Sequence, residues 1–180
     1  MLNRDEAVLV VVDVQEKLLP AIHDQEQMLR RTRLLIRGAG LLQLPILVTE
    51  QYPQGIGPTD AGIVKALGES YQPIQKASMS AMSEPAFLEA LVASGRRQVI
   101  LCGIEAHVCV YLTAQDMRAD SRAVYVATDC ISSRQERDYA IAVQRMEAIG
   151  CCLTTHEMAV FELLRQSGTS EFKQWIQMIR

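Results

Sequence analysis

The sequence has no apolar run that approaches the roughly 20 residues a membrane helix needs. It also lacks the N-terminal order of basic region, apolar region and small-residue cleavage site that marks a secretory signal. No block of like charge stands out and the net charge is −3, so we expect neither a nucleic-acid nor a membrane partner. The five cysteines form no C-x-x-C pair, which argues against a zinc knuckle or a thioredoxin-like site.

The composition is that of an ordinary globular protein. Of its 180 residues, 49% are hydrophobic and 22% are charged, which suits one domain with a substantial core, expected to span residues 1–180. The cysteines are odd in number and lie largely in apolar runs. We therefore expect reduced thiols and a cytoplasmic location.

Strand patterns alternate with helix patterns along the chain. The expected strands are Ala7–Asp13, Pro45–Thr49, Gln72–Lys76, Gln98–Cys102, Ala123–Thr128 and Cys151–Thr155. The expected helices are Gln25–Leu42, Ala61–Leu67, Ala86–Ser94, His107–Ala119, Gln135–Ile149, His156–Leu164 and Ser170–Ile179. This order predicts a three-layer, doubly wound α/β fold: a six-stranded, mainly parallel sheet with helices on both faces. The long loop Glu50–Pro58 is a candidate substrate-binding segment or oligomer contact.

The stretch Val99–Ala114 reads V-I-L-C-G-I-E-A-H-V-C-V-Y-L-T-A. Its apolar start, Val99–Cys102, predicts a strand buried on both faces, and Gly103 is expected to end it. Helical spacing begins at about His107, which places Cys109 near the N-terminus of a helix that follows a strand. Unpaired N–H groups and the helix dipole would lower the pKa of a thiol there. We therefore expect Cys109 to be a nucleophile.

Two other reactive side chains stand at the ends of predicted strands, Asp13 after the first and Lys76 after the third. The carboxyl ends of parallel strands lie at one edge, so we expect both side chains to meet Cys109 in one cleft. Asp13 would take the thiol proton, and Lys76 would stabilise the thiolate and hold Asp13 in place. Backbone amides around Glu105–Cys109 would stabilise the oxyanion formed when the thiolate attacks an acyl carbon.

Each of these residues also has a structural interpretation. A cysteine in an apolar stretch is usually a small core residue, Asp13 alone could cap a loop, and Lys76 alone could be a solvated lysine. His107 is a rival base, and with Cys109 it offers two metal ligands, although no third or fourth ligand follows at a useful spacing. Asp129 is expected to bind backbone or a neighbouring helix. The cysteines expected to be structural are Cys102, Cys151 and Cys152.

Three motifs resemble those of the isochorismatase-like cysteine hydrolase superfamily, which includes nicotinamidases and N-carbamoylsarcosine amidohydrolases. G-I-E-A-H-V-C-V, from Gly103 to Val110, is similar to its nucleophile motif, and D-V-Q-E-K-L, from Asp13, is similar to its first-strand motif. Lys76 and the small-residue loop after it resemble the lysine segment. The motifs occur in family order, and the resemblance covers nearly the whole chain.

The resemblance implies a catalytic triad of Asp13, Lys76 and Cys109. It also implies a cis peptide bond between Ile104 and Glu105. In the family this bond turns the amide at the Glu105 position toward the oxyanion hole, beside the amide at the Cys109 position.

One departure from the resemblance concerns metal binding. Nicotinamidases bind a metal through an aspartate and two histidines after the second strand, whereas residues 49–60 here read T-E-Q-Y-P-Q-G-I-G-P-T-D, without histidine. We therefore expect no metal site and no nicotinamidase activity. Met79 stands where relatives often carry an aromatic residue. The candidate substrate-binding residues are Gln15, Tyr52, Met79, Glu105 and His107.

The expected function is that of a metal-independent, cofactor-free cysteine hydrolase, acting on a small amide or related acyl compound through a thioester intermediate. The resemblance also implies a homo-oligomer. Two other classes stay open. One is a scaffold or interaction module that keeps the fold without useful turnover. The other is a redox-sensing thiol protein, in which Cys109 is reversibly oxidised.

Overall fold

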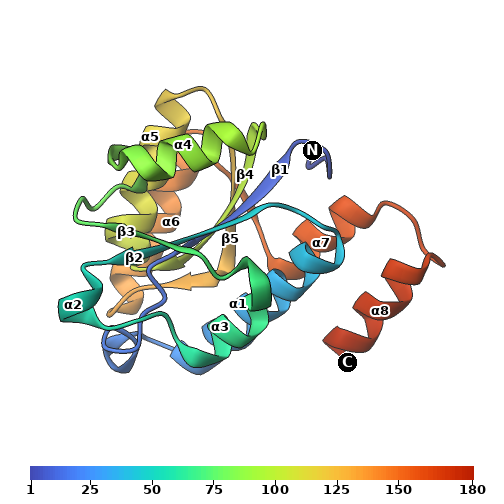
Figure 1. Ribbon diagram of the computed structural model, residues 1–180, viewed down its shortest axis with the longest axis horizontal. Coiled ribbons are helices and arrows are strands. Elements are labelled where there is room, and N and C mark those ends of the chain that lie inside the picture. The colour runs from blue at the N-terminus through green and yellow to red at the C-terminus, as the bar shows by residue number, and fades with distance from the viewer.

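The computed structural model describes all residues 1–180. A six-stranded sheet forms the middle layer, and helices cover both of its faces (Figure 1). The strands are β1 (Ala7–Val12), β2 (Ile46–Gln51), β3 (Pro73–Lys76), β4 (Gln98–Ile104), β5 (Ala123–Ser132) and β6 (Cys152–Thr154). The α-helices are α1 (Gln25–Leu41), α2 (Pro53–Ile56), α3 (Ala61–Leu67), α4 (Pro85–Ala93), α5 (Tyr111–Ala119), α6 (Glu136–Ala148), α7 (His156–Leu164) and α8 (Ser170–Ile179). Short 3-10 turns cover Leu19–Ala21, Gly68–Ser70 and Ala81–Ser83, and a π-helical turn covers Ala106–Val110.

The strand order is β3-β2-β1-β4-β5-β6, and every pairing is parallel. The predicted fold class is therefore confirmed. From β1 the chain runs outward through β2 and β3, then returns to the other side of β1 for β4. The order thus reverses between β1 and β4. In open α/β sheets, ligands bind at the carboxyl ends of the strands beside such a reversal.

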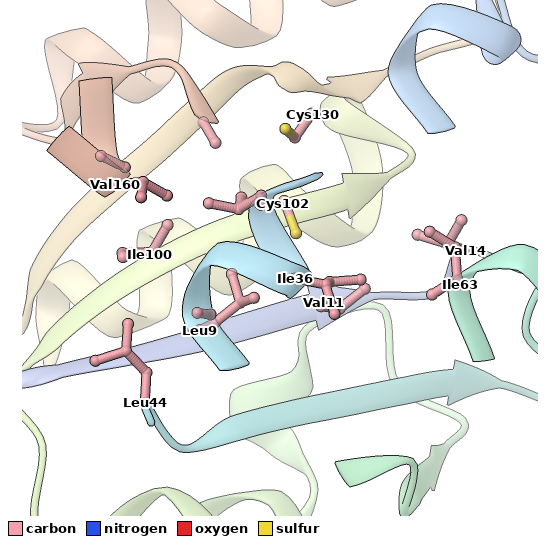
Figure 2. Close-up of a cluster of buried hydrophobic side chains, with 14 of the residues drawn as sticks. Leu9, Val11, Val14, Ile36, Leu44, Ile63, Ile100, Cys102, Cys130 and Val160 are labelled. Carbon is pink, nitrogen blue, oxygen red and sulfur yellow. The ribbon is translucent and has the colours of Figure 1, made fainter. Parts of the chain in front are cut away.

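Two hydrophobic cores hold the helices against the sheet. One core packs α1, α3, α7 and α8 on one face, and the other packs α4, α5 and α6 on the opposite face. Figure 2 shows part of the first core, where the sulfurs of Cys102 and Cys130 lie among aliphatic side chains. All six residues of β1 are buried, because this central strand is covered on both faces. This burial explains its continuous apolar sequence.

The expectation that Gly103 ends a strand is wrong. Strand β4 continues through Gly103 to Ile104, because glycine adopts a φ of +118° there. A Cβ on Gly103 would overlap the carbonyl oxygen of Val12 and lie 2.6 Å from its nitrogen. Glycine therefore lets β4 pair closely with β1 up to the carboxyl ends of both strands.

Strand β5 is also longer than expected and runs to Ser132 instead of ending at Thr128. The register shifts between Leu101 and Gly103, because Leu101 pairs with Val126 while Gly103 pairs with Ile131. The bulge lets β5 follow the extended end of β4.

Two other segments differ from the sequence-based expectation. The helix expected from His107 starts with the π-helical turn, and regular α-helix begins only at Tyr111. The loop expected at Glu50–Pro58 contains the end of β2 and the short helix α2. None of the helices combines the length and the apolar character needed to cross a membrane.

Replacing Gly103 by alanine should lower the free energy of unfolding by about 3 kcal/mol or more, because the methyl group meets backbone at a positive φ. Gly40→Ala is the matched control, since a Cβ there meets nothing within 4 Å inside α1. It should raise stability by about 0.5–1 kcal/mol. Urea unfolding measures both changes. Equal effects of the two substitutions would contradict this packing.

Candidate active site

The three residues expected to act together lie at one edge of the sheet. Asp13 directly follows β1, Lys76 is the last residue of β3, and Cys109 lies in the π-helical turn after β4. All three are buried, with exposed fractions of 0%, 4% and 7%. The three residues therefore lie together at the carboxyl edge of the sheet, beside the reversal in strand order, and their catalytic roles stay a prediction.

Asp13 and Lys76 form a buried ion pair. Lys76 Nζ lies 2.8 Å from Asp13 Oδ2, and neither side chain is exposed. The hydroxyl of Thr49, at the end of β2, donates to Asp13 Oδ1 over 2.7 Å. Asp13 Oδ2 accepts no well-aligned hydrogen bond despite its short distance to Nζ. This oxygen therefore has a lone pair available for another proton.

The ammonium group of Lys76 is fixed by three further oxygens. It donates to Gln51 Oε1 over 2.5 Å, to the carbonyl of Ser78 over 3.0 Å and to the carbonyl of Met79 over 3.2 Å. The charge is thus solvated by protein instead of water, which offsets part of the cost of its burial. These contacts also fix where the cation lies relative to Asp13.

The loop that supplies those carbonyls is itself held in place. Glu84 Oε1 accepts hydrogen bonds from the amides of Ala77 and Ser78, both 3.0 Å long, and from the Ser78 hydroxyl over 2.8 Å. The bonds from Ser78 and Ala77 lower the pKa of Glu84. The amide of Ala81 donates to Thr113 Oγ1 of α5 over 3.0 Å. The loop from Ala77 to Glu84 is therefore held by hydrogen bonds to its last residue, Glu84, and to α5, the helix that follows Cys109.

The thiol of Cys109 differs from the sequence-based expectation. Burial raises its pKa to about 12, and the charge of Asp13 acts in the same direction while the charge of Lys76 opposes it. Hydrogen bonding with Asp13 also raises the pKa of the thiol, and hydrogen bonding with Lys76 lowers it. The expectation of a lowered pKa is therefore wrong for the free protein. Cys109 is protonated near neutral pH and needs a base before it can attack.

The backbone before Cys109 forms a compact turn. The peptide bond between Ile104 and Glu105 is cis. The carbonyl of Glu105 accepts hydrogen bonds from the amides of Val108 and Val110, 3.0 Å and 3.2 Å long. These bonds close the turn that carries Cys109.

The side chains of Glu105 and His107 both reach segments that follow β5. Glu105 Oε2 forms a 2.8 Å ion pair with Arg134 Nε. His107 Nδ1 lies 2.9 Å from Ser133 Oγ. Both side chains thus have protein partners, and their contact with a substrate stays a prediction.

The other predicted substrate-binding residues have different environments. Gln15 is fully buried, and its side-chain nitrogen donates to the carbonyls of Gln51 and Gly57 while its oxygen accepts from the Gln51 amide. Gln15 therefore ties the segment after β1 to the end of β2. Tyr52 is 59% exposed and Met79 is 47% exposed, so both are free to contact a ligand. A role in substrate binding remains a prediction for all three.

Sequence reasoning missed two polar residues of the site, Thr49 and Gln51. Both lie at the end of β2, between Asp13, which follows β1, and Lys76 on β3. The rule that found Asp13 would have found them too, because it applies to every strand end. Their residue types carry no signal of their own.

A second polar cluster lies at the other side of the sheet, where Asp129, Cys130 and His156 bring their donor atoms within 4.8 Å of one another. Asp129 accepts from the His156 amide over 2.9 Å and lies 2.6 Å from its Nδ1, while the Cys130 thiol lies 3.5 Å from the same carboxylate. The donor types suit a transition metal. They are already bonded to each other, however, and the carboxylate joins β5 to the start of α7, as expected for Asp129.

The cysteines outside the site also divide by environment. Cys102, Cys130 and Cys151 are buried, and burial raises the pKa of each thiol. Cys152 is exposed on the edge strand β6, so the expectation of a structural role is not supported there.

The fold and this site define a three-layer α/β protein with a cysteine, a lysine and an aspartate buried together where the strands end. The family model described as Isochorismatase domain matches residues 7–158. The chain therefore belongs to the isochorismatase family, and it is a hydrolase of that family.

Similar proteins cover nearly the full length of the chain. Isochorismatase domain-containing protein 2 of Danio rerio is 34% identical over 96% of this chain and 86% of its own. A structure described as MAR1 ribonuclease from Caenorhabditis elegans is 36% identical, has a TM-score of 0.92, and is matched over 99% of this chain and 91% of its own. The YcaC gene product of Escherichia coli, described as an octameric hydrolase of unknown specificity, has a TM-score of 0.92 at 23% identity, over 98% and 89% of the two chains. It shows the same fold.

Asp129→Asn should lower the free energy of unfolding at pH 7 by about 1–3 kcal/mol, because it weakens the two hydrogen bonds that join Asp129 to His156. Burial by itself would raise the pKa of Asp129, but the hydrogen bonds and charge of His156 outweigh burial and hold the pKa below its usual value. The stabilisation is therefore complete above the unfolded pKa of about 3.9 and is lost as pH falls through the lower folded pKa. Thermal unfolding between pH 7 and 3 measures it.

The control is Asp5→Asn, because Asp5 is exposed and its carboxylate has no partner. This variant should match the wild type at each pH. If Asp129→Asn loses stability with falling pH as the wild type does, this acid sensitivity does not come from Asp129, which would contradict the prediction.

Proposed function

We propose that this protein is a metal-independent cysteine hydrolase that cleaves the C–N bond of a small amide or a related acyl bond. Asp13 is the base, Lys76 the electrostatic partner and Cys109 the nucleophile. The observation that supports the proposal is the convergence of these three buried groups beside the reversal in strand order. An ammonium and a carboxylate next to a thiol form the set that thiol activation needs.

The raised pKa of the thiol determines how the first step runs. Asp13 Oδ2 takes the proton of Cys109 as Sγ attacks the carbonyl carbon, so that free thiolate never accumulates. The carbonyl π electrons move to oxygen, and the amides of Glu105 and Cys109 are proposed to stabilise that oxyanion. Collapse breaks the C–N bond, and the leaving nitrogen takes the proton back from Asp13. The product on Cys109 is a thioester.

Water completes the reaction. Asp13 removes a proton from a water molecule that attacks the thioester carbonyl, and the second tetrahedral intermediate expels the sulfur, which is reprotonated. Lys76 keeps its charge throughout and stabilises each negative charge that forms beside it. The overall change is hydrolysis of the amide to a carboxylic acid and an amine or ammonia.

The exposed residues beside the three reactive groups are proposed to bind the rest of a small substrate. Exposed Tyr52 and Met79 follow β2 and β3, and both are proposed to contact the part of the substrate away from the scissile bond. Gln15 is proposed to act indirectly, through the loop that carries Tyr52. The octameric state given for the Escherichia coli neighbour supports a homo-oligomer here.

The ribonuclease name of the Caenorhabditis elegans relative makes RNA a second candidate substrate. A thiol nucleophile suits an acyl carbon, because the resulting thioester is readily hydrolysed. The amide proposal is therefore preferred, and RNA becomes an outcome of the test.

The test measures ammonia release from small primary amides and N-carbamoyl compounds. Cys109→Ala and Cys109→Ser should abolish the activity, and Asp13→Asn should lower it by about 10²–10⁴-fold through loss of the base. Intact mass after an acid quench should show the acyl adduct on the wild type and not on Cys109→Ala.

Cys152→Ser is the matched control, because Cys152 is an exposed thiol on β6, and it should keep full activity. Turnover that survives Cys109→Ala would contradict the mechanism. RNA cleavage without amide turnover would replace the substrate class. Reversible oxidation of Cys109 without any adduct or turnover would favour the redox thiol, and none of these activities would favour the scaffold module.

A further inference from the structure

A hollow of about 650 Å³ lies between α1, α3 and the end of α8. The basic side chains of Arg30, Arg33, Arg37 and Lys65 line it, and no carboxylate does. We call this hollow the arginine groove. Its helices belong to the core on one face of the sheet, whereas Cys109 packs in the core on the other face (Figure 1). The groove is thus separate from the candidate active site.

The helical repeat places the three arginines on one side of α1. Residues 30, 33 and 37 are three and four positions apart, so neighbouring Cβ atoms are about 5–6 Å from each other. The opposite side of α1 is buried against the sheet, with Leu35, Ile36 and Ala39 in the core. Lys65 enters the groove from α3, which packs against α1. Two helices therefore direct cations into one space.

These four cations have no partners within the protein. All ion pairs of Lys, Arg or His within 4.0 Å involve Arg4, Lys76, Arg122, Arg134 or His156. The nearest acidic residues along the chain are Glu26, Asp60 and Glu69. Glu26 is one turn before Arg30, Glu69 is four residues after Lys65, and the carboxylate of Asp60 caps α3 through the Ile63 amide. Like charges at helical spacing repel each other. A bound anion would relieve this repulsion.

A glycine makes room for the half-buried arginine of the set. A Cβ on Gly62 would lie 2.7 Å from Arg33 Nη1 and 3.0 Å from Asp60 Oδ1. The guanidinium of Arg33 therefore lies directly over the backbone of α3. Its fork lines the wall of the groove, where it can offer two N–H groups to one phosphate.

We propose that the arginine groove binds a nucleotide, with the phosphates on the arginines and Lys65, and the base on the apolar wall. That wall consists of Leu34, Ala66 and Met178. A volume of about 650 Å³ falls in the range of small-molecule sites. The phosphates of a nucleotide match the positive charge of the groove, and its planar base matches the apolar side chains that line the wall.

The charge outside the groove favours a compact anion over a long one. The whole chain has a net charge of −3, so removing the four groove cations leaves −7 on the rest. A nucleic acid that extended beyond the groove would meet this acidic remainder. A nucleoside triphosphate keeps its charge within reach of the four cations.

Isothermal titration with ATP, inorganic triphosphate and adenosine tests the proposal on the full chain. ATP should bind tighter than triphosphate, adenosine should bind weakest, and added NaCl should weaken ATP binding. Arg33→Gln and Arg37→Gln should each weaken it by about tenfold, as expected for loss of a charge-assisted hydrogen bond. Arg137→Gln is the matched control, because Arg137 is exposed and unpaired on α6, and its affinity should equal that of the wild type.

Ala66→Glu provides a second variant that keeps all four cations. Its carboxylate supplies an anion from within, so it should abolish ATP binding while the free protein stays folded by circular dichroism. Hydrolase activity should be unchanged, because the groove is separate from Cys109.

Four results would overturn the proposal. They are no heat of binding with 1 mM ATP, equal weakening by Arg137→Gln, tighter binding of a short RNA than of ATP through the same arginines, and a changed oligomeric state of the arginine variants without nucleotide binding. The third would assign the groove to RNA, and the fourth would make it a contact between copies of the chain.

Discussion

The ion pair between Asp13 and Lys76 is the interaction on which the site depends. Two opposite charges that are both removed from water need each other and further polar partners, because removing either partner leaves an uncompensated buried charge. Those partners come from the end of β2 and from the loop after β3. The pair therefore fixes three strand ends and one loop relative to each other. The stability of this edge and the position of its reactive groups have a common origin.

The same pair determines the chemistry of the thiol next to it. Burial and the charge of Asp13 keep Cys109 protonated, and the charge of Lys76 partly opposes them. A thiol of this kind reacts more slowly with oxidants and alkylating agents than an exposed thiol does, yet its proton acceptor is adjacent. The proposed mechanism uses Asp13 in both ways, since its charge holds the proton on sulfur until a substrate is in place and its oxygen then receives it. Reactivity is thereby linked to substrate binding.

The fold could be predicted because its strongest signals are local. Continuous apolar runs such as β1 indicate strands buried on both faces, and the parallel arrangement then brings Asp13, Lys76 and Cys109 to one edge. The pKa of the thiol could not be predicted, because it is set by burial among groups distant in sequence. The course of β4 through Gly103 depends on a backbone approach that appears only when β1 is beside it. The arginines of α1 resemble any solvated helix face until α3 is placed against them.

The most direct test of the central claim is site-resolved alkylation with limiting iodoacetamide at pH 7, followed by peptide mapping, in the wild type and in Lys76→Met. Exposed Cys152 serves as the internal reference, and buried Cys102 reports any loss of folding. The account predicts that Cys109 reacts faster than Cys102, and that Lys76→Met slows Cys109 by about tenfold or more relative to Cys152, because loss of the cation raises the thiol pKa further. A Cys109 that reacts as slowly as Cys102, or at the same rate without Lys76, would contradict it.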